Sequence, residues 1–280
     1  NVGKSTLFNS ISSGKAEAAN FPFCTIEPNL GIVNVPDKRL DTLSSLVNPK
    51  KTIPTSIKFV DIAGLVKGAS KGEGLGNKFL SNLKEVDVLI HVIRCFDNDN
   101  IVHVNGKIDP LSDKEIIDYE LIIKDLESID KRISRVEKLA KSRDKEKIKE
   151  LEVLNKSKKY LEDGNSLRTL SFNLGEKYIL GDLNLITIKP VVYVANIDEK
   201  VISNDNNHID SLNDAVTKEG NSTIKICASL EEQLNDLNEE DRKLFLDDYN
   251  LKESGLDKLI RVSYDALNLL TYFTAGDKEV

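Results

Sequence analysis

The sequence predicts an α/β fold with a mostly parallel sheet, because buried-strand patterns alternate with helical patterns along the chain. The nearly continuous apolar runs Val88–Ile93 and Val191–Ala195 are typical of strands that are covered on both faces. Weaker strand patterns occur at Thr223–Cys227 and at Ile57–Val60, and Ser5–Ile11 has the pattern of a helix. Strands that alternate with helices in this way usually form a parallel sheet.

The segment 113–165 differs in composition from the rest of the chain. It is highly charged, and Asp113–Asp163 contains neither proline nor glycine. Apolar residues recur there with spacings of 3 and 4, at Tyr119, Ile122, Leu126, Ile129, Ile133, Val136 and Ala140. This heptad pattern predicts a long helix of coiled-coil type. Ser142–Asp144 is a candidate turn, and a less regular returning helix is indicated by Ile148, Leu151, Leu154 and Leu161. We therefore predict an antiparallel helical hairpin over 113–165, inserted into one domain that comprises 1–112 and 166–265.

Composition and cysteine usage narrow the class of protein. No apolar run approaches the roughly 20 residues that a membrane helix needs. The three cysteines are scattered and fit neither a disulfide framework nor a zinc site, so we expect a cytoplasmic protein without a membrane partner. The formal net charge of -7 argues against nucleic-acid binding by the whole surface, and we expect no sequence-specific DNA partner.

The first residues match the end of the phosphate-binding pattern G-x-x-x-x-G-K-[ST]. Backbone N–H groups near Gly3 can surround a phosphate, Lys4 can supply a positive charge, and the Ser5 hydroxyl can complete the shell of Mg²⁺. The helix that follows directs its positive end at the same anion. A short match of this kind also occurs by chance. The predicted phosphate-binding residues for a purine nucleoside triphosphate are Asn1, Val2, Gly3, Lys4, Ser5 and Thr6.

A second motif, Phe59–Gly64, is a hydrophobic strand that ends in D-x-x-G. Asp61 can reach the magnesium ion and the Gly64 N–H can contact the γ-phosphate, although an ordinary strand and turn is the alternative. Thr25 lies between the two motifs, where a threonine can bind magnesium until the triphosphate is hydrolysed, as in a switch loop. A turn residue beside prolines is the alternative for Thr25. The spacing favours Ser5, Thr25 and Asp61 as the magnesium ligands.

The residues that recognise the base are expected after the buried strand at 191–195. A GTPase carries N-K-x-D here, whereas this chain keeps Asn196 but has Ile197 in place of lysine and Glu199 in place of aspartate. Because a glutamate is one methylene longer, it is misplaced for the two hydrogen bonds that an aspartate accepts from guanine, while Asn196 can still bind N7 of a purine. This change loosens guanine selectivity and permits ATP. Ser229, in a candidate last nucleotide loop, is expected near the base, with an ordinary strand end as the alternative.

Taken together, these motifs resemble the YchF-type Obg-like ATPases, which are P-loop proteins related to translation factors. The resemblance spans the chain and is carried by Asn1–Thr6, Ala19–Asn29, Asp61–Asn77, Asn196–Glu199 and Tyr272–Gly276. It implies a G domain, a coiled-coil insert and a small β-rich TGS domain, together with a preference for ATP over GTP and association with ribosomes. The chain has no methionine and opens within a motif, so we expect a fragment that lacks the first strand of its sheet and in which 266–280 begins a truncated TGS domain.

Hydrolysis requires a group that positions the attacking water, and in many GTPases a glutamine after D-x-x-G does so. Leu65 occupies that position here, and the resemblance includes this substitution. His103 is the leading substitute, because an imidazole can orient water or accept its proton near neutral pH, although it has the alternative of an ordinary surface histidine. His91 lies in a buried-strand pattern and is expected to be structural, and His208 is expected to be solvated. The predicted catalytic residues are His103, Lys4 and Gly64.

The predicted hairpin is locally basic, since Lys124–Glu162 contains 13 lysines and arginines and 9 acidic residues. Such a hairpin can lie along ribosomal RNA through phosphate contacts, or it can be a coiled coil whose charges are merely solvated. The favoured function is a ribosome-associated switch that binds and hydrolyses ATP with Mg²⁺, in preference to GTP. Two alternatives stay open: a GTPase of the same fold with relaxed base choice, and a nucleotide-sensing binding protein whose hydrolysis is incidental.

Overall fold

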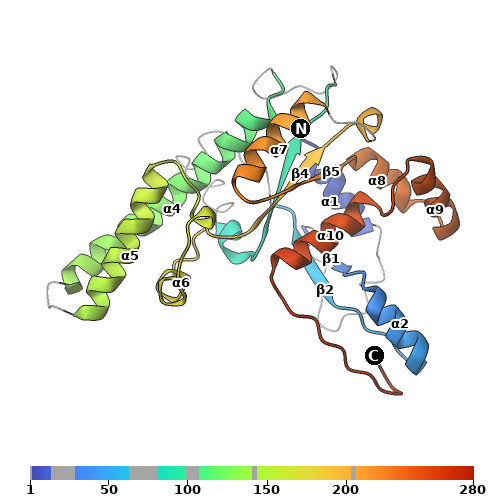
Figure 1. Cartoon of the computed structure of the whole chain (residues 1–280), viewed down its shortest axis with the longest axis horizontal. Coiled ribbons are helices and arrows are strands. Elements are labelled where there is room, and N and C mark those ends of the chain that lie inside the picture. Colours follow the sequence, from blue (N-terminus) through green and yellow to red (C-terminus); the bar gives the residue numbers. More distant parts are fainter. Residues whose placement is uncertain (1, 14–28, 63–80, 99–106, 141–143, 203–205) are drawn as a thin grey trace.

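The computed structural model of the 280-residue chain describes residues 2–13, 29–62, 81–98, 107–140, 144–202 and 206–280. Its strands form one parallel sheet in the order β3-β4-β5 and one antiparallel pair, β1-β2 (Figure 1). The strands are β1 (Leu30–Asn34), β2 (Ser56–Val60), β3 (Leu89–Arg94), β4 (Val191–Asn196) and β5 (Thr223–Ile226). The predicted α/β fold with a parallel sheet is therefore confirmed.

The sequence pattern did not indicate β1. Its five residues include a glycine and an asparagine, which are poor strand formers. It forms by pairing with β2, and Gly31 lies opposite Phe59 in that pair. Its side chains alternate between buried and half-buried, as in a strand with one face on the core. A pattern of this kind depends on the partner strand and is weak in the sequence alone.

The central strand β4 is buried on both faces and separates two apolar cores, which explains its continuous apolar run. Tyr193 and Ala195 belong to a core that α7 (Asn207–Lys218) and α8 (Ala228–Asn235) cover. Val192 and Val194 belong to a second core, which is covered by the helices α1 (Lys4–Ser13) and α10 (Gly255–Ala266). Successive residues of a strand point to opposite faces, so a strand with helices on both sides is apolar at every position.

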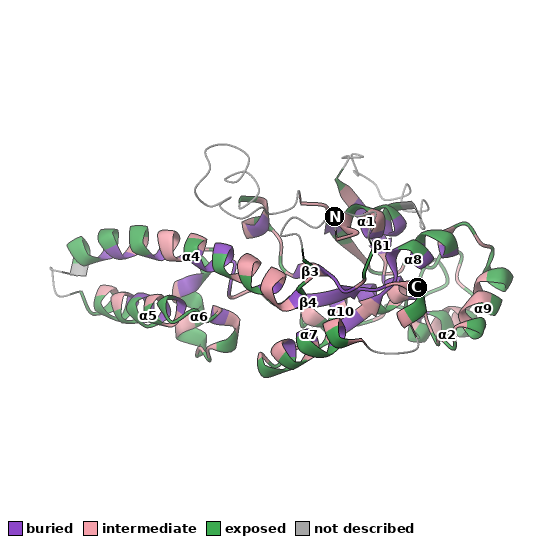
Figure 2. Ribbon diagram, turned by 90° about the horizontal axis from the view of Figure 1, so that it is seen from above, coloured by how far each residue is buried: buried purple, intermediate pink, exposed green. Residues whose placement is uncertain are grey.

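The predicted hairpin is present as α4 (Pro110–Ala140) and α5 (Lys145–Glu162). Figure 2 shows buried residues along the facing sides of the two helices and exposed residues on their outer sides. Asp144 caps α5, since its carboxylate accepts hydrogen bonds from the N–H groups of Glu146 and Lys147. Two predicted core positions were wrong: Tyr119 is 58% exposed and Ile148 is 41% exposed. Tyr119 lies beside Gly164, just beyond the end of α5. Ile148 lies off the packed face of α5, whose buried residues are Glu150, Val153, Leu154, Ser157 and Leu161.

The root of the hairpin is tied to the sheet by buried polar groups. Lys114 of α4 is 4% exposed and forms ion pairs with Asp118 and with Glu219, which follows α7. The Tyr193 hydroxyl donates to the other Glu219 oxygen at 2.9 Å. Further along α4, the fully buried Asp125 carboxylate accepts from backbone N–H groups of residues 186 and 187. Since buried charges persist only when they are paired, these contacts fix where the hairpin leaves the sheet.

The other helical elements with described bounds are α2 (Lys38–Val47), α6 (Leu174–Gly181), α9 (Glu239–Asp248) and the 3₁₀ turns η3 (Leu167–Thr169) and η4 (Glu199–Val201). Leu167 of η3 and Leu180 of α6 are buried in the core of the hairpin. The C-terminal segment lies beside the α2–β2 connection, where Val280 accepts a hydrogen bond from the Ile53 N–H and donates one to Lys51. The assignment of 266–280 to a TGS domain stays a prediction. Across the described ranges, every helix is too short or too polar to cross a membrane.

Candidate nucleotide-binding site

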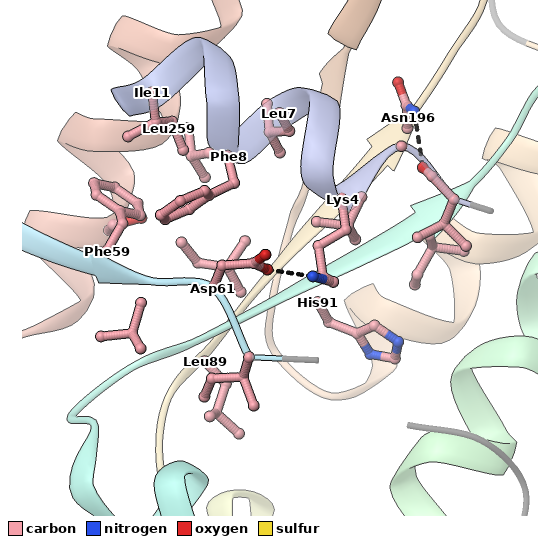
Figure 3. Close-up of a pocket in the computed structure, with 18 of the residues that line it drawn as sticks. Lys4, Leu7, Phe8, Ile11, Phe59, Asp61, Leu89, His91, Asn196 and Leu259 are labelled. Atoms are coloured by element: carbon pink, nitrogen blue, oxygen red, sulfur yellow. Dashed lines mark hydrogen bonds and ion pairs between the residues drawn. The ribbon is translucent and has the colours of Figure 1, made fainter. Parts of the chain in front are cut away.

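A cavity of about 1870 Å³ lies between α1, β2 and β3 and reaches the C-terminal ends of β4 and β5. One part of its wall is apolar and includes Leu7, Phe59 and Leu89, and the other part carries Lys4 and Asp61 (Figure 3). The polar part contains most of the residues that the sequence predicts for nucleotide binding. In an open α/β sheet, ligands bind beyond the carboxyl ends of the strands, which agrees with this position.

Gly3 has a backbone conformation that no other residue adopts easily, with φ at +86°. A Cβ atom at this position would lie 2.2 Å from the Asn196 Nδ2 atom, which is much closer than van der Waals contact. Lys4 then begins α1, so the first N–H groups of the helix are directed towards the cavity. Two independent constraints therefore require glycine at the turn that leads into the predicted phosphate site.

Asn196 connects the turn to two other loops. Its Nδ2 atom donates to the Val2 carbonyl at 2.8 Å, and its Oδ1 atom accepts from the Ala228 N–H at 3.1 Å. The residue is 5% exposed, so these bonds form away from water. Asn196 lines the cavity as predicted, and its amide nitrogen has a second proton that the bond to Val2 does not use. The bonds show a connecting role that the sequence did not indicate.

The Lys4 ammonium group forms an ion pair with the Asp61 carboxylate across the polar end of the cavity. Both side chains are partly exposed, so solvent can exchange with this pair. Ser5 is exposed and also lines the cavity. Hydroxyl and carboxylate oxygens are the ligands that Mg²⁺ prefers beside water and phosphate, and Asp61 already attracts a cation here. The residues present therefore fit a magnesium ion.

The base end of the site differs from the prediction at one residue. Glu199 is absent from the cavity wall, and its carboxylate accepts a hydrogen bond from the Gln233 amide at 3.3 Å. Its neighbour Asp198 lines the cavity instead, together with Ser229. Ile197 also lines it but is 4% exposed, and its side chain belongs to the apolar core. In this structure the Glu199 side chain thus lies towards α8, and its role at the base stays a prediction.

The described histidines and cysteines are structural or peripheral. Burial lowers the pKa of His91 to about 4, so its imidazole is neutral at physiological pH and packs beside Tyr193, as expected of a structural residue. Burial raises the pKa of the Cys95 thiol to about 12 and also raises the pKa of Cys227, so neither is a nucleophile. His208 is half-buried, with its Nε2 atom 3.5 Å from an Asp97 oxygen, whereas the sequence predicted a solvated side chain.

Known proteins resemble the chain over its whole length. A profile of 50S ribosome-binding GTPases matches residues 1–156. The ribosome-binding ATPase YchF of Bacillus subtilis is 50% identical over 282 residues, which cover 100% of this chain and 77% of that protein. The protein of the same name from Escherichia coli O157:H7 is 50% identical over 280 residues, with the same coverage. The chain belongs to the YchF family.

A solved structure from the YchF family agrees with this fold. The structure of the Schizosaccharomyces pombe YchF GTPase has a TM-score of 0.88 and 37% identity, and the match covers 100% of this chain and 76% of that one. A GTP-binding protein from Pyrococcus horikoshii has a TM-score of 0.56 at 19% identity, which supports the fold alone. The predicted resemblance to the YchF family is thus confirmed in sequence and in structure.

Several residues that the sequence predicts for the site lie outside the described residues, and their roles stay predictions. These are Asn1, Thr25, Gly64, Leu65 and His103. Among the described residues, the cavity brings together Val2, Gly3, Lys4, Ser5, Thr6, Asp61, Asn196, Ile197 and Ser229. Asp198 also lines the cavity but was not predicted to do so. It occupies position x of the N-K-x-D pattern, where the pattern specifies no residue type.

Proposed function

We propose that this chain binds and hydrolyses ATP with Mg²⁺, in preference to GTP, and acts as a nucleotide-dependent switch on ribosomes. The observation that carries the proposal is the meeting of Lys4 and Asp61 in one cavity, at the start of α1 and just after β2. The Bacillus subtilis and Escherichia coli relatives are named ribosome-binding ATPases, which supports the choice of nucleotide and of partner.

The phosphates would lie at the first turn of α1. The N–H groups that follow Gly3 and the Lys4 ammonium group would bind the phosphate oxygens, and the positive end of the helix favours the same charge. Lys4 is paired with Asp61 in this structure, so ATP would replace the carboxylate with phosphate oxygens around the ammonium group. This exchange would leave the Asp61 carboxylate available for a cation.

We propose Ser5, Thr25 and Asp61 as the residues that hold Mg²⁺, which would neutralise the negative charge on the phosphates when it is bound. The Gly64 N–H would contact the γ-phosphate, and His103 would orient the attacking water. Replacement of His103 by alanine should lower turnover and leave ATP affinity intact, whereas His208→Ala should change neither. Unchanged turnover in the first variant would remove His103 from the mechanism.

Hydrolysis should depend on Lys4, and Lys38 provides a matched control because it is the first residue of α2 as Lys4 is of α1. A charged hydrogen bond contributes about 1.5–3 kcal/mol, so Lys4→Ala should slow phosphate release from ATP by roughly ten- to a hundredfold. Lys38→Ala should leave the rate unchanged. Phosphate release is measured with purified chain, ATP and Mg²⁺, and equal rates in the two variants would contradict the proposal.

The hairpin is the proposed contact with ribosomal RNA. Its outer face presents exposed basic side chains from α4 at spacings of 4 and 3, namely Lys131, Arg135 and Lys138. Cations in such an array bind phosphates without reading sequence. We accordingly propose the division into a G domain (1–112 and 166–265), a helical insert (113–165) and the start of a TGS domain (266–280). If ribosomes accelerate turnover, hydrolysis belongs to the switch; if they do not, nucleotide-sensing with incidental hydrolysis is favoured.

A further inference from the structure

Two adjacent carboxylates follow Asn196, and they have different surroundings. Glu199 begins the 3₁₀ turn η4, and its Oε1 atom accepts a hydrogen bond from Gln233 Nε2 of α8 at 3.3 Å. Asp198 precedes this turn with an extended backbone (φ -82°, ψ 153°), and it lines the cavity beside Ser229. Of the two acidic residues, Asp198 is therefore the one that lines the cavity.

The backbone holds Asp198 in place from both sides. On one side, the Ile197 N–H donates to the Ile226 carbonyl at 2.9 Å, and the Ile197 side chain is buried in the core. On the other side, the Val201 N–H donates to the Asp198 carbonyl at 3.0 Å. Asn196, two residues earlier, is fixed by its bonds to the first and the last loop of the site. Asp198 is thus positioned by residues that also build the nucleotide site.

A carboxylate at this position distinguishes the two purines by their hydrogen-bond donors. Guanine presents two adjacent donors, N1–H and the N2 amino group, and an ionised carboxylate has two oxygens that accept in parallel. Adenine presents one donor, the N6 amino group, beside N1, which is an acceptor and repels a carboxylate oxygen.

We propose that Asp198, in place of Glu199, is the carboxylate that contacts the base, and that it gives the site affinity for GTP beside ATP. The inference rests on the proposed function, because it requires that the cavity binds purine nucleoside triphosphates. The proposal explains how a site without the aspartate of the N-K-x-D pattern can still offer a carboxylate to guanine. The S. pombe relative's printed name, YchF GTPase, agrees with retained guanine binding in this family.

Asp198→Asn and Glu199→Gln make the same chemical change at adjacent residues, so each controls for the other. Dissociation constants for ATP and GTP are measured by calorimetry with Mg²⁺ on the whole chain. Since hydrogen bonds to a charged group are worth about 1.5–3 kcal/mol, Asp198→Asn should weaken GTP binding roughly tenfold or more, and ATP binding about threefold or less. Glu199→Gln should leave both constants within about twofold, because losing one exposed hydrogen bond outside the cavity contributes little.

A measurement on the unchanged chain does not depend on how the variants fold. Inosine triphosphate has N1–H but lacks the N2 amino group, so it should bind at least roughly tenfold more weakly than GTP, as expected for one lost hydrogen bond to a charged group. In Asp198→Asn the two nucleotides should bind equally. Equal binding of GTP and inosine triphosphate to the unchanged chain, or a change of base preference in Glu199→Gln, would overturn the role of Asp198.

Failure of the inference is separable from failure of the proposed function. If the unchanged chain binds ATP, Lys4→Ala weakens that binding, and Asp198→Asn keeps the same ratio of GTP to ATP affinity, only the role of Asp198 is overturned. If the unchanged chain binds neither nucleotide, the proposed function itself is overturned, and the inference with it.

Discussion

The helical hairpin and the nucleotide site are assembled from contacts of very different range. In the hairpin, neighbouring helices share one apolar core around Ile129 and Leu154, and its ion pair Arg132–Glu150 joins residues 18 positions apart. In the nucleotide site, Asn196 bonds to a carbonyl 194 positions earlier. The hairpin is therefore specified by local periodicity, whereas the nucleotide site exists only when distant segments have met. Substitutions in the two regions should separate stability from binding.

The largest expected effect is on the hairpin, at Ile129, which is fully buried between the two helices. Truncation of a buried isoleucine to alanine costs about 2–5 kcal/mol, because it removes apolar contact and leaves a cavity. Ile129→Ala should therefore increase hydrogen exchange across α4 and α5 and leave ATP affinity unchanged. Ile148→Ala, at an exposed position of α5, should show neither change. A loss of ATP affinity in Ile129→Ala would show that the two regions are coupled.

Next in size is the effect of a methyl group at Gly3. A left-handed backbone costs a non-glycine residue about 1–2 kcal/mol. Gly220→Ala should show this cost alone, since φ there is +77° and no heavy atom lies within 4 Å of the added Cβ. Gly3→Ala adds the contact with Asn196, so it should lower the free energy of unfolding further and also weaken ATP binding. Thermal unfolding and calorimetry would measure both, and equal effects of the two variants would refute the steric argument.

Charge reversal on the hairpin should affect ribosome binding and spare the nucleotide site. Changing Lys131, Arg135 and Lys138 to glutamate should weaken co-sedimentation with ribosomes about tenfold and reduce its salt dependence, since each phosphate contact contributes to the salt slope. Reversal of three exposed lysines elsewhere is the control with the same net charge, at Lys218, Lys243 and Lys258. An equal loss in the control would attribute binding to overall charge and not to the hairpin.

The smallest effect concerns acid stability of the hairpin. Burial alone would raise the pKa of Glu150, but hydrogen bonds from Lys147 and Arg132 outweigh it and hold that pKa below its ordinary value. A depressed pKa in the folded state stabilises the hairpin at neutral pH, and this contribution is lost as the pH falls below about 4.3, the ordinary glutamate value. Helicity measured by circular dichroism against pH should show this loss, and Glu150→Gln should reduce it.

The sequence predicts the hairpin well because its information is local. The heptad positions Ile122, Ile129, Ile133 and Val136 are all buried, and Asp144 of the predicted turn caps α5. The error at Tyr119 occurs where α4 continues beyond the end of α5, because periodicity within one helix does not report the length of the other. The error at Ile148 occurs because α5 packs through a different face, which includes Glu150 and Ser157. Likewise β4 was found because both of its faces are covered, whereas β1 depends on its pairing with β2.

The candidate site was predicted as far as motifs define it. Lys4 and Asp61 form an ion pair in the cavity. The P-loop pattern fixes a lysine at the start of a helix, and the D-x-x-G pattern fixes an aspartate at the end of a strand. The surroundings of Glu199 were not predictable, since its carboxylate bonds to Gln233 of α8, whereas the neighbouring Asp198 lines the cavity. Side-chain directions at a loop are set by such tertiary partners, and residue spacing does not contain them.

The bonds of Asn196 have a consequence for the order in which the molecule is made. Val2 is synthesised 194 residues before Asn196, so its carbonyl acquires its amide partner only after β4 has been synthesised, and the Ala228 N–H follows later still. Long-range contacts of this kind form late, because the intervening chain must first be ordered. A nascent chain would thus carry a folded hairpin before it could retain nucleotide. The bonds of Asn196 could be completed only after Ala228 has been synthesised.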